Sequence, residues 1–210
     1  MFVGKVTDVF NDRPSHGFAD LGSRRFVFEV HESFGTALGA TVEVLTDMSS
    51  CGAEFVRGQT YLVDAGTADD GTIVASACSY TQFASSASTE IEILRRMASG
   101  KPHRAIFGQL IESRKPGPTS RATDPDLWQP LRDVPVVISG GTRSYHATTD
   151  GDGRFAVWNL PKGRYRLELA LPPPLKLEKY FRGFHQADAN PDLIQLAECP
   201  ARVTLVARGW

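Results

Sequence analysis

Short stretches of alternating apolar and polar residues follow one another through the first eighty positions of the chain. A period of two places apolar side chains on one face of a β-strand, so each stretch predicts a strand. The last two are separated by Asp69-Asp70-Gly71, and an Asp-Gly step between apolar runs predicts a hairpin because glycine adopts positive φ cheaply. The predicted strands cover residues 2–10, 26–30, 41–46, 61–65 and 73–78.

A helical period then replaces the alternation. Ile91, Leu94 and Met97 recur every three residues and predict one apolar face on a helix that ends at Ser99. The candidates for its N-cap are Ser85, Ser86 and Ser88. Gly100 and Pro102 end the helix. We place the boundary between two domains, residues 1–100 and 104–210, at this point.

A second all-β pattern begins at residue 105. Its predicted strands cover residues 105–111, 134–138, 142–149, 154–158, 164–170, 193–196 and 203–206. The sequence Asp150-Gly151-Asp152-Gly153 lies between two of them and predicts a hairpin turn. Residues 113–130 are a polar, proline-rich insertion, and residues 172–192 are expected to form a crossing loop.

The first domain resembles the netrin-type module, the barrel domain of the tissue inhibitors of metalloproteinases. The residues that carry the resemblance are Cys51-Gly52, Phe55, Gly58, Tyr61-Leu62-Val63, Gly71 and Cys78-Ser79-Tyr80-Thr81, with Val3-Gly4-Lys5-Val6 and Arg24-Arg25-Phe26-Val27-Phe28-Glu29-Val30 upstream. The resemblance implies a five-stranded Greek-key barrel of the OB type with a flanking helix. We expect the helix to cover one end of this barrel.

The second domain resembles the carboxypeptidase regulatory-like domain, which is related to repeats of bacterial surface adhesins. The matching residues are Gly108-Gln109-Leu110-Ile111, Val134-Pro135-Val136, Thr149-Asp150-Gly151-Asp152-Gly153 with Phe155, and Leu160-Pro161-Lys162-Gly163 with Tyr165. The resemblance implies a seven-stranded β-sandwich of the immunoglobulin or transthyretin type. Such a fold says little about function by itself.

The chain has three cysteines, Cys51, Cys78 and Cys199. In the netrin-type inhibitors, a Cys-x-Cys at the N-terminus bonds to the cysteines that Cys51 and Cys78 match, whereas this chain opens with Met1-Phe2. We therefore expect a shortened form of an extracellular or cell-envelope protein, without its signal peptide and with a C-terminus that is also cut. A reduced intracellular protein is the alternative. Cys51 and Cys78 either bond to each other, which would contribute about 3–4 kcal/mol, or remain unpaired.

Composition and motifs argue against several classes of function. A net charge of −1 disfavours a nucleic-acid partner, and no apolar run reaches the length of a transmembrane segment. No histidine has a second ligand at helical spacing, and no nucleophile elbow or phosphate loop occurs, so we expect no catalytic residue, metal or cofactor. Asp150 and Asp152 could ligate calcium, but turn geometry explains them more simply.

Two groups of residues are candidates for surface contacts. A basic patch for an acidic polysaccharide could form from Arg24, Arg25, Lys176, Lys179 and Arg182, although neighbouring acids favour ordinary solvated faces. The aromatic residues Trp128, Tyr180, Phe181 and Phe184 lie in stretches that resemble loops. They mark either a partner interface or the seam between the domains.

Two functions follow from these observations. The first is a non-enzymatic extracellular binding or structural module of the adhesion type, with a protein or polysaccharide ligand. The second is inhibition of metalloproteinases, which the netrin-type resemblance implies. Such inhibitors chelate the catalytic zinc through the α-amino group and carbonyl of an N-terminal cysteine held by disulfides. Because Met1-Phe2 stand at that position here, we expect the present chain not to inhibit.

Overall fold

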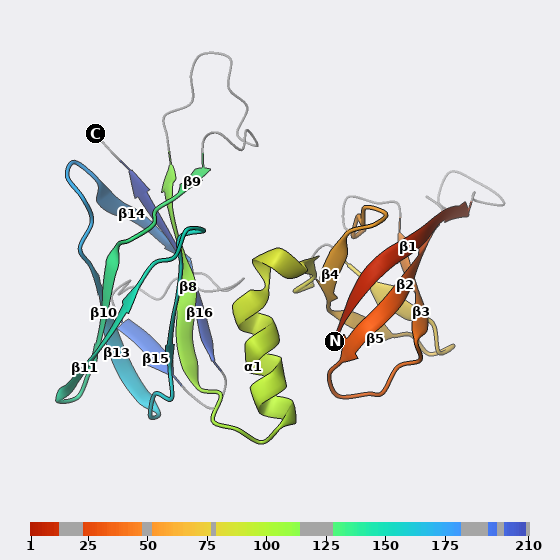
Figure 1. Cartoon of the computed structure of the whole chain (residues 1–210), viewed down its shortest axis with the longest axis horizontal. Coiled ribbons are helices and arrows are strands. Elements are labelled where there is room, and N and C mark those ends of the chain that lie inside the picture. Colours follow the sequence, from red (N-terminus) through yellow and green to blue (C-terminus); the bar gives the residue numbers. More distant parts are fainter. Residues whose placement is uncertain are drawn as a thin grey trace, which may run out of the picture. The chain divides into compact units, whose positions relative to one another are not determined.

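The computed structural model describes residues 1–12, 23–47, 52–76, 79–113, 128–181, 193–196 and 200–208. The chain divides into two compact units, Met1–Lys101 and Pro102–Trp210. Within the described residues the fold is mainly β, and the first unit also carries an α-helix (Figure 1). This confirms the predicted mainly-β class with one helix, although the strand counts differ from the predicted five and seven.

The first unit is a curled sheet that closes on itself. Its strands are β1 (Phe2–Asp12), β2 (Ser23–Ser33), β3 (Thr41–Asp47), β4 (Thr60–Val63), β5 (Ala65–Thr67), β6 (Ile73–Ala75) and β7 (Gln82–Phe83). They are ordered β5–β6–β3–β2–β1–β4–β7. Because Asp64 alone separates β4 from β5, these two act as one bent strand that joins both sides of the sheet. With β3 and β6 parallel, this is the strand order of an OB-type barrel.

Aromatic rings fill the interior of the barrel. Phe55 lies at their centre, and its ring centroid is 5.0 Å from those of Phe26, Phe28 and Tyr61, in edge-to-face geometry. Phe2 packs against Phe28 in the same way, at 5.5 Å. Edge-to-face pairs of this kind stabilise a core beyond simple burial. The barrel therefore has a packed interior rather than a lumen.

The helix α1 (Ser88–Ala98) follows a 3-10 turn, η1 (Ala84–Ser86). Its N-cap is Ala87, with no side-chain cap, so the predicted serine caps are wrong. Ile91 and Ile93 are its buried residues, whereas Met97 is 47% exposed and does not belong to the apolar face as predicted. As expected, the helix ends before Gly100, which adopts a φ of +66°.

The position of α1 also corrects an expectation. Ile91 packs with Val3 of β1 and Leu62 of β4. These two residues alternate along their strands with Phe2 and Val63, which belong to the barrel core. Side chains of successive strand residues point to opposite faces. The helix therefore covers the outer face of β1 and β4, and not an open end of the barrel.

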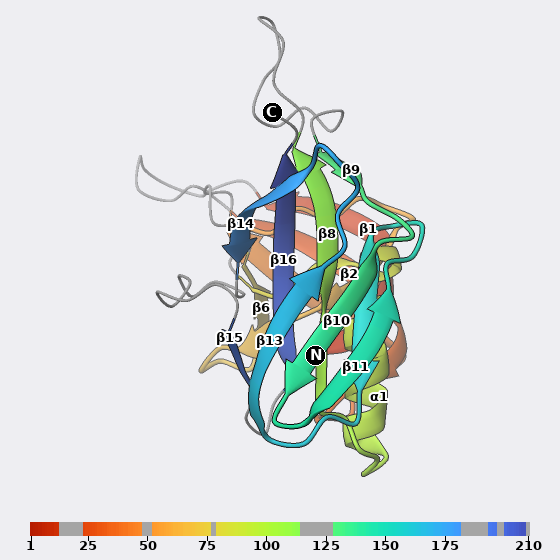
Figure 2. The ribbon, with the colours of Figure 1, turned by 90° about the vertical axis from the view of Figure 1, so that its left-hand side faces the viewer.

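The second unit is a sandwich of two sheets. Its strands are β8 (Ala105–Ser113), β9 (Trp128–Pro130), β10 (Pro135–Gly140), β11 (Arg143–Thr148), β12 (Arg154–Trp158), β13 (Gly163–Leu169), β14 (Lys176–Phe181), β15 (Leu193–Leu196) and β16 (Ala201–Arg208). One sheet has the order β11–β10–β13–β15, and the other has β12–β8–β16–β14 with β9 beside β8 (Figure 2). The strands of both sheets contribute to one apolar core.

Three sequence predictions for this unit need correction. The sheets hold four and five strands rather than seven in all. The segment expected to be a crossing loop contains β14, which pairs antiparallel with β16. The turn at 150–153 is no hairpin, because β11 pairs with β10 and β12 pairs with β8 in the other sheet. Its glycines and aspartates instead serve a connection that crosses from one sheet to the other.

Candidate functional site

A row of four side chains crosses the outer face of the barrel. Phe10 of β1 lies opposite Arg25 of β2, Arg25 opposite Leu45 of β3, and Leu45 opposite Val74 of β6. Their neighbours Phe26, Val44 and Ala75 are buried in the barrel core, so the alternation of a strand directs the row outward. Phe10 is 45% and Val74 40% exposed. We call these four residues the outer row.

Arg25 is the polar centre of the outer row. Its guanidinium carbon lies 5.0 Å from the centroid of the Phe10 ring, within the range of a cation–π interaction. On its other side Arg25 forms an ion pair with Glu43, with a nitrogen–oxygen distance of 3.5 Å. A planar guanidinium held between a ring and a carboxylate loses little further freedom when a ligand binds it.

A depression of about 510 Å³ opens beside the outer row. Its lining residues are Arg25, Thr41, Val42, Glu43, Leu45, Gly71, Thr72 and Ile73. It exists because β3 and β6 pair at a single position, Leu45 opposite Val74, while residues 41–44 pair with β2 alone. The parallel strands β3 and β6 therefore separate on the side of residues 41–44, and we call the gap between them the seam. We call this depression the seam pocket.

The turn between β5 and β6 forms one rim of the seam pocket. The carboxylate of Asp70 accepts a hydrogen bond from the backbone N–H of Thr72 at 2.9 Å. This bond and a second one from the Thr72 side chain lower the pKa of Asp70 below its ordinary value of 3.8. Ala68 N–H also donates to Thr72 O at 2.8 Å. The rim is thus a hydrogen-bonded turn at neutral pH.

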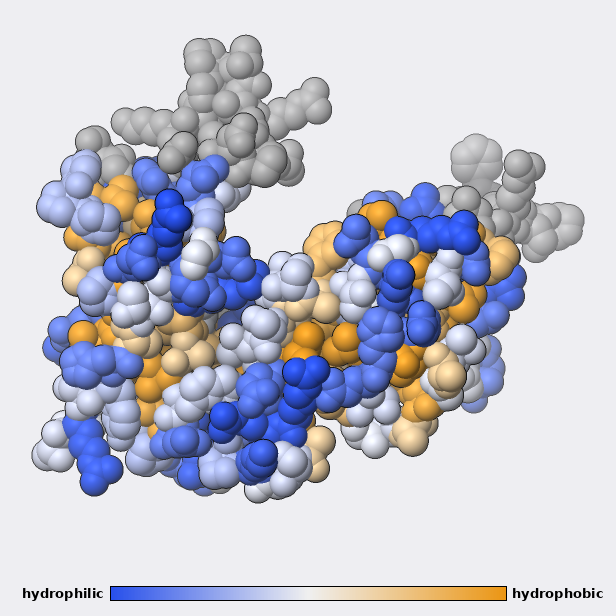
Figure 3. All heavy atoms as spheres, viewed as in Figure 1, coloured by the Kyte–Doolittle hydropathy of each residue, from blue (hydrophilic) through white to orange (hydrophobic). Residues whose placement is uncertain are grey.

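The described charges at the outer row are largely paired. Arg25 and Glu43 form one ion pair, and the Asp70 carboxylate adds a negative charge on the rim of the seam pocket. Arg57 and Asp8 form an ion pair at 3.0 Å. Polar and apolar residues are also interspersed over the visible face of each unit (Figure 3). The described residues of this face form no electropositive groove of the kind that holds nucleic-acid phosphates.

The candidate basic patch does not form around Arg24 and Arg25, in agreement with the preferred interpretation of solvated faces. The two side chains alternate across β2, and Arg24 pairs with Glu54 at 3.0 Å while Arg25 pairs with Glu43. Exposed pairs of this kind contribute little to stability, but each one neutralises its arginine. Of the other proposed members, Lys179 and Arg182 have side chains outside the described residues.

Most of the remaining predicted site residues, or their side chains, lie outside the described part of the chain. Cys51, Cys78 and Cys199 lie outside the described residues, as does Phe184. Trp128 begins β9 and is 42% exposed. Tyr180 and Phe181 belong to β14, where they pair with Leu205 and Thr204, but their side chains are not described. The proposed disulfide and the aromatic interface stay predictions.

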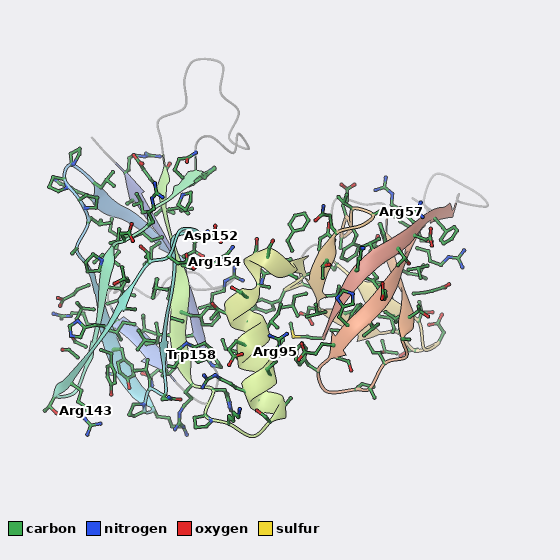
Figure 4. All side chains as sticks on the ribbon, viewed as in Figure 1. Arg57, Arg95, Arg143, Asp152, Arg154 and Trp158 are labelled. Atoms are coloured by element: carbon green, nitrogen blue, oxygen red, sulfur yellow. The ribbon has the colours of Figure 1, made fainter. Side chains whose placement is uncertain are left out.

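The turn at 150–153 satisfies its acidic residues internally. The Asp150 carboxylate accepts hydrogen bonds from the backbone N–H groups of Asp152 and Arg154, at 2.9 and 2.8 Å. The Arg154 side chain pairs with Asp152 at 3.0 Å, beside the turn (Figure 4). Among the described residues no group of three or more potential ligands could hold a metal ion. The turn interpretation of these aspartates therefore accounts for the geometry.

Among the described residues, Arg95 and Tyr165 also have shifted pKa values, and both shifts reinforce the ordinary charge state at neutral pH. Arg95 donates hydrogen bonds to Glu32 from Nη2 and Nε to Oε2, at 2.8 and 2.9 Å, and from Nε to Oε1, at 3.1 Å, and these bonds raise the pKa of Arg95. Burial raises the pKa of Tyr165, whose hydroxyl donates to Pro161 O at 2.7 Å. Acid–base catalysts instead have pKa values drawn toward neutrality.

In the part of the chain that the structure describes, no helix is long and apolar enough to cross a membrane.

Neither a protein-family model nor a curated protein sequence matches this chain.

The sequence had singled out Arg25 as a surface candidate, but not its neighbours Phe10, Glu43 and Val74. The alternation predicted which residues face outward. It did not predict which of them lie opposite one another, because register shifts between Val3 and Gly4 and between Val6 and Asp8 displace the pairing of β1.

Proposed function

We propose that this protein is a non-enzymatic binding protein of the extracellular or cell-envelope kind, whose barrel unit holds its ligand on the outer row and seam pocket. The observation that carries this proposal is the combination of a concave site with an exposed aromatic ring and a fixed ion pair. Binding sites commonly join apolar surface to a few convergent polar groups in this way.

The packed interior of the barrel supports an external site. Phe55 and its ring neighbours occupy the space that a wider barrel would offer to a ligand. The helix α1 covers the outer face of β1 and β4 near Val3, but Phe10 lies further along β1 and remains exposed. The outer row is therefore accessible apolar surface on a rigid sheet, which suits recognition without large rearrangement.

The sandwich unit suits a structural role in this proposal. Its two sheets enclose one continuous apolar core, and its acidic turn at 150–153 is satisfied by its own backbone. The sequence resemblance to adhesin-related domains points the same way. We infer that this unit acts as a spacer or attachment module for the barrel.

Retention on immobilised extracellular polymers tests the proposal. The purified chain is applied to neutral polysaccharides, acidic polysaccharides and matrix proteins. We expect retention on at least one polymer, with at least fivefold loss in the double variant Phe10→Ala/Glu43→Ala. A control double variant, Tyr80→Ala/Glu168→Ala, removes an exposed aromatic and an exposed acid elsewhere and should bind normally. Equal retention of both variants, or polymer degradation in proportion to added protein, would contradict the proposal.

Metalloproteinase inhibition, the alternative implied by the netrin-type resemblance, has less support. The carbonyl oxygen of Met1 accepts a hydrogen bond from Phe34 N–H at 2.9 Å. Met1 also packs against the apolar cluster of Val3, Phe34 and Leu62. If Met1 took the place of the inhibitors' N-terminal cysteine, this carbonyl would have to coordinate the catalytic zinc. Its engagement in the fold therefore opposes that role, and nanomolar inhibition of a zinc endopeptidase would reverse this conclusion.

A further inference from the structure

We propose that the ligand of the seam pocket is a short neutral oligosaccharide, bound with the Phe10 ring against the apolar face of one sugar. This inference rests on the proposed function and names its ligand class. It depends on four properties of the site: its hydrogen-bonding groups, its apolar surface, its balance of charge and its size.

The hydrogen-bonding groups complement sugar hydroxyls. Arg25 presents guanidinium donors, Glu43 presents carboxylate acceptors, and the Thr41 hydroxyl is both donor and acceptor. A sugar hydroxyl can likewise donate one hydrogen bond and accept others. Two hydroxyls on neighbouring carbons can therefore engage Arg25 and Glu43 together, since these two side chains already lie 3.5 Å apart.

The apolar surface complements the C–H groups of a sugar ring. The Arg25 guanidinium lies over one face of the Phe10 ring, so a sugar contacts the remaining surface of this residue, which is nearly half exposed. Leu45 and Val74 continue the outer row past Arg25. The negative face of an aromatic ring attracts weakly positive C–H groups. Carbohydrate binding thus uses both the ring and the polar cluster, whereas a purely apolar ligand would leave Arg25 and Glu43 desolvated without compensation.

The charge balance favours a neutral ligand. A sulfate or phosphate that approached Arg25 would also face the Glu43 carboxylate, and like charges at this distance repel. The flanking pair of Arg57 and Asp8 adds no net charge, and the Asp70 carboxylate on the rim adds a negative charge that repels an anion. A single-stranded nucleic acid needs an electropositive path for its phosphates, which the described face does not offer.

The size of the site favours a short stretch of chain. The volume of about 510 Å³ lies within the usual range for small-molecule pockets. The outer row begins beside the pocket and reaches β1, so further sugar units can lie along it. The Asp70–Thr72 hydrogen bonds keep the rim of the pocket in place before binding, which lowers the ordering cost.

Titration with defined oligosaccharides tests the inference. The probes are cellotetraose, chitotetraose, maltotetraose and mannotetraose, with a heparin hexasaccharide and a deoxythymidine decamer as charged probes. Binding is followed by calorimetry and by amide shifts in the full-length ¹⁵N-labelled protein. We expect at least one neutral probe to bind saturably, with shifts concentrated at Arg25, Glu43 and Thr72.

Matched variants show whether the site is the one proposed. Phe10→Ala should weaken binding on the order of tenfold, as the loss of a central aromatic contact does. Tyr80→Ala, which removes a similarly exposed ring elsewhere, should leave binding unchanged. Glu43→Gln should weaken the neutral probe several-fold and allow the charged probes to bind. The amide spectrum of each variant confirms that it is folded.

The outcomes separate this inference from the proposed function. If a charged probe or a matrix protein binds at the outer row and no neutral oligosaccharide does, the sugar inference is wrong and the binding function stands. If a neutral probe binds but shifts residues elsewhere, the assignment to the seam pocket is wrong. If no probe binds and polymer retention is also independent of Phe10 and Glu43, both proposals are wrong.

Discussion

At Gly108, in β8, the fold has room for a hydrogen atom and nothing larger. The neighbouring parallel strand β16 places Val203 directly opposite. A Cβ atom on Gly108 would come to 2.1 Å from the carbonyl oxygen of Val203 and 2.6 Å from its Cγ2 atom. Because the nearer obstruction is backbone, no change of rotamer relieves it. Only glycine at this position allows β8 and β16, the first and last strands of the sandwich, to pair.

We therefore predict that Gly108→Ala destabilises the sandwich unit by about 2–3 kcal/mol. The free energy of unfolding is measured by urea titration. Gly151→Ala is the matched control, because a Cβ atom there meets no atom within 4 Å. The control should change stability by less than about 0.5 kcal/mol. A similar loss in both variants would mean that general glycine effects, and not the approach of β16, explain the result.

Among the elements, the turn between β5 and β6 depends on one carboxylate. The Asp70 carboxylate accepts both the backbone and side-chain hydrogen bonds of Thr72, which lower its pKa. Because the pKa of Asp70 is lower in the folded state, its ionised carboxylate stabilises the turn at pH values above the ordinary pKa of 3.8. This stabilisation is lost as the pH falls through the folded-state pKa. At neutral pH the turn is at its most ordered.

We predict that the Thr72 amide resonance titrates with a midpoint below pH 3.8, following Asp70 and not the bulk of the carboxylates. Proton NMR between pH 2 and 7 measures this midpoint. Asp70→Asn should remove the titration at Thr72, whereas Asp69→Asn, at the preceding position, should preserve it. A midpoint above 3.8 in the original chain would show that the carboxylate does not hold the turn.

The elements were predictable where one local pattern decided them. The alternation of apolar and polar residues correctly predicted the central residues of strands such as β3 and β12, and Gly100 correctly predicted the end of the helix. The pattern failed where tertiary pairing decided. An Asp-Gly turn has the same local chemistry in a hairpin and in a connection between sheets, so the turn at 150–153 was assigned wrongly.

The candidate site was less predictable than the strands. Outward residues such as Phe10 and Glu43 are ordinary surface residues in the sequence. They become a site because β2 aligns with both β1 and β3, which brings Arg25 between them. The seam depends on where β3 and β6 stop pairing. Neither the β-bulges nor this end of pairing leaves a signal that alternation can detect.

At the scale of the whole molecule, each unit has an apolar core built from its own segment of the chain. The barrel core centres on Phe26, Phe28 and Phe55, and the sandwich core includes Leu110 and Leu205. The two segments, Met1–Lys101 and Pro102–Trp210, each have a size at which a domain can fold around one core. We therefore expect the two units to unfold as separate cooperative transitions.

The distribution of tryptophan makes this expectation testable. All three tryptophans, Trp128, Trp158 and Trp210, lie in the second segment, so their fluorescence reports the sandwich unit, whereas far-ultraviolet circular dichroism reports both units. We predict that Leu205→Ala, which leaves a cavity in the sandwich core, costs about 2–5 kcal/mol and lowers the fluorescence-detected midpoint.

Phe28→Ala provides the reciprocal change in the barrel. Its side chain is fully buried and touches the Phe2 and Phe55 rings edge to face. Its loss should cost about 3–5 kcal/mol and lower one component of the dichroism transition by roughly 4–8 °C per kcal/mol. The fluorescence midpoint should not move, because no tryptophan lies in that segment. If both variants shift both signals equally, the two cores unfold as one cooperative unit and the division into independent transitions is wrong.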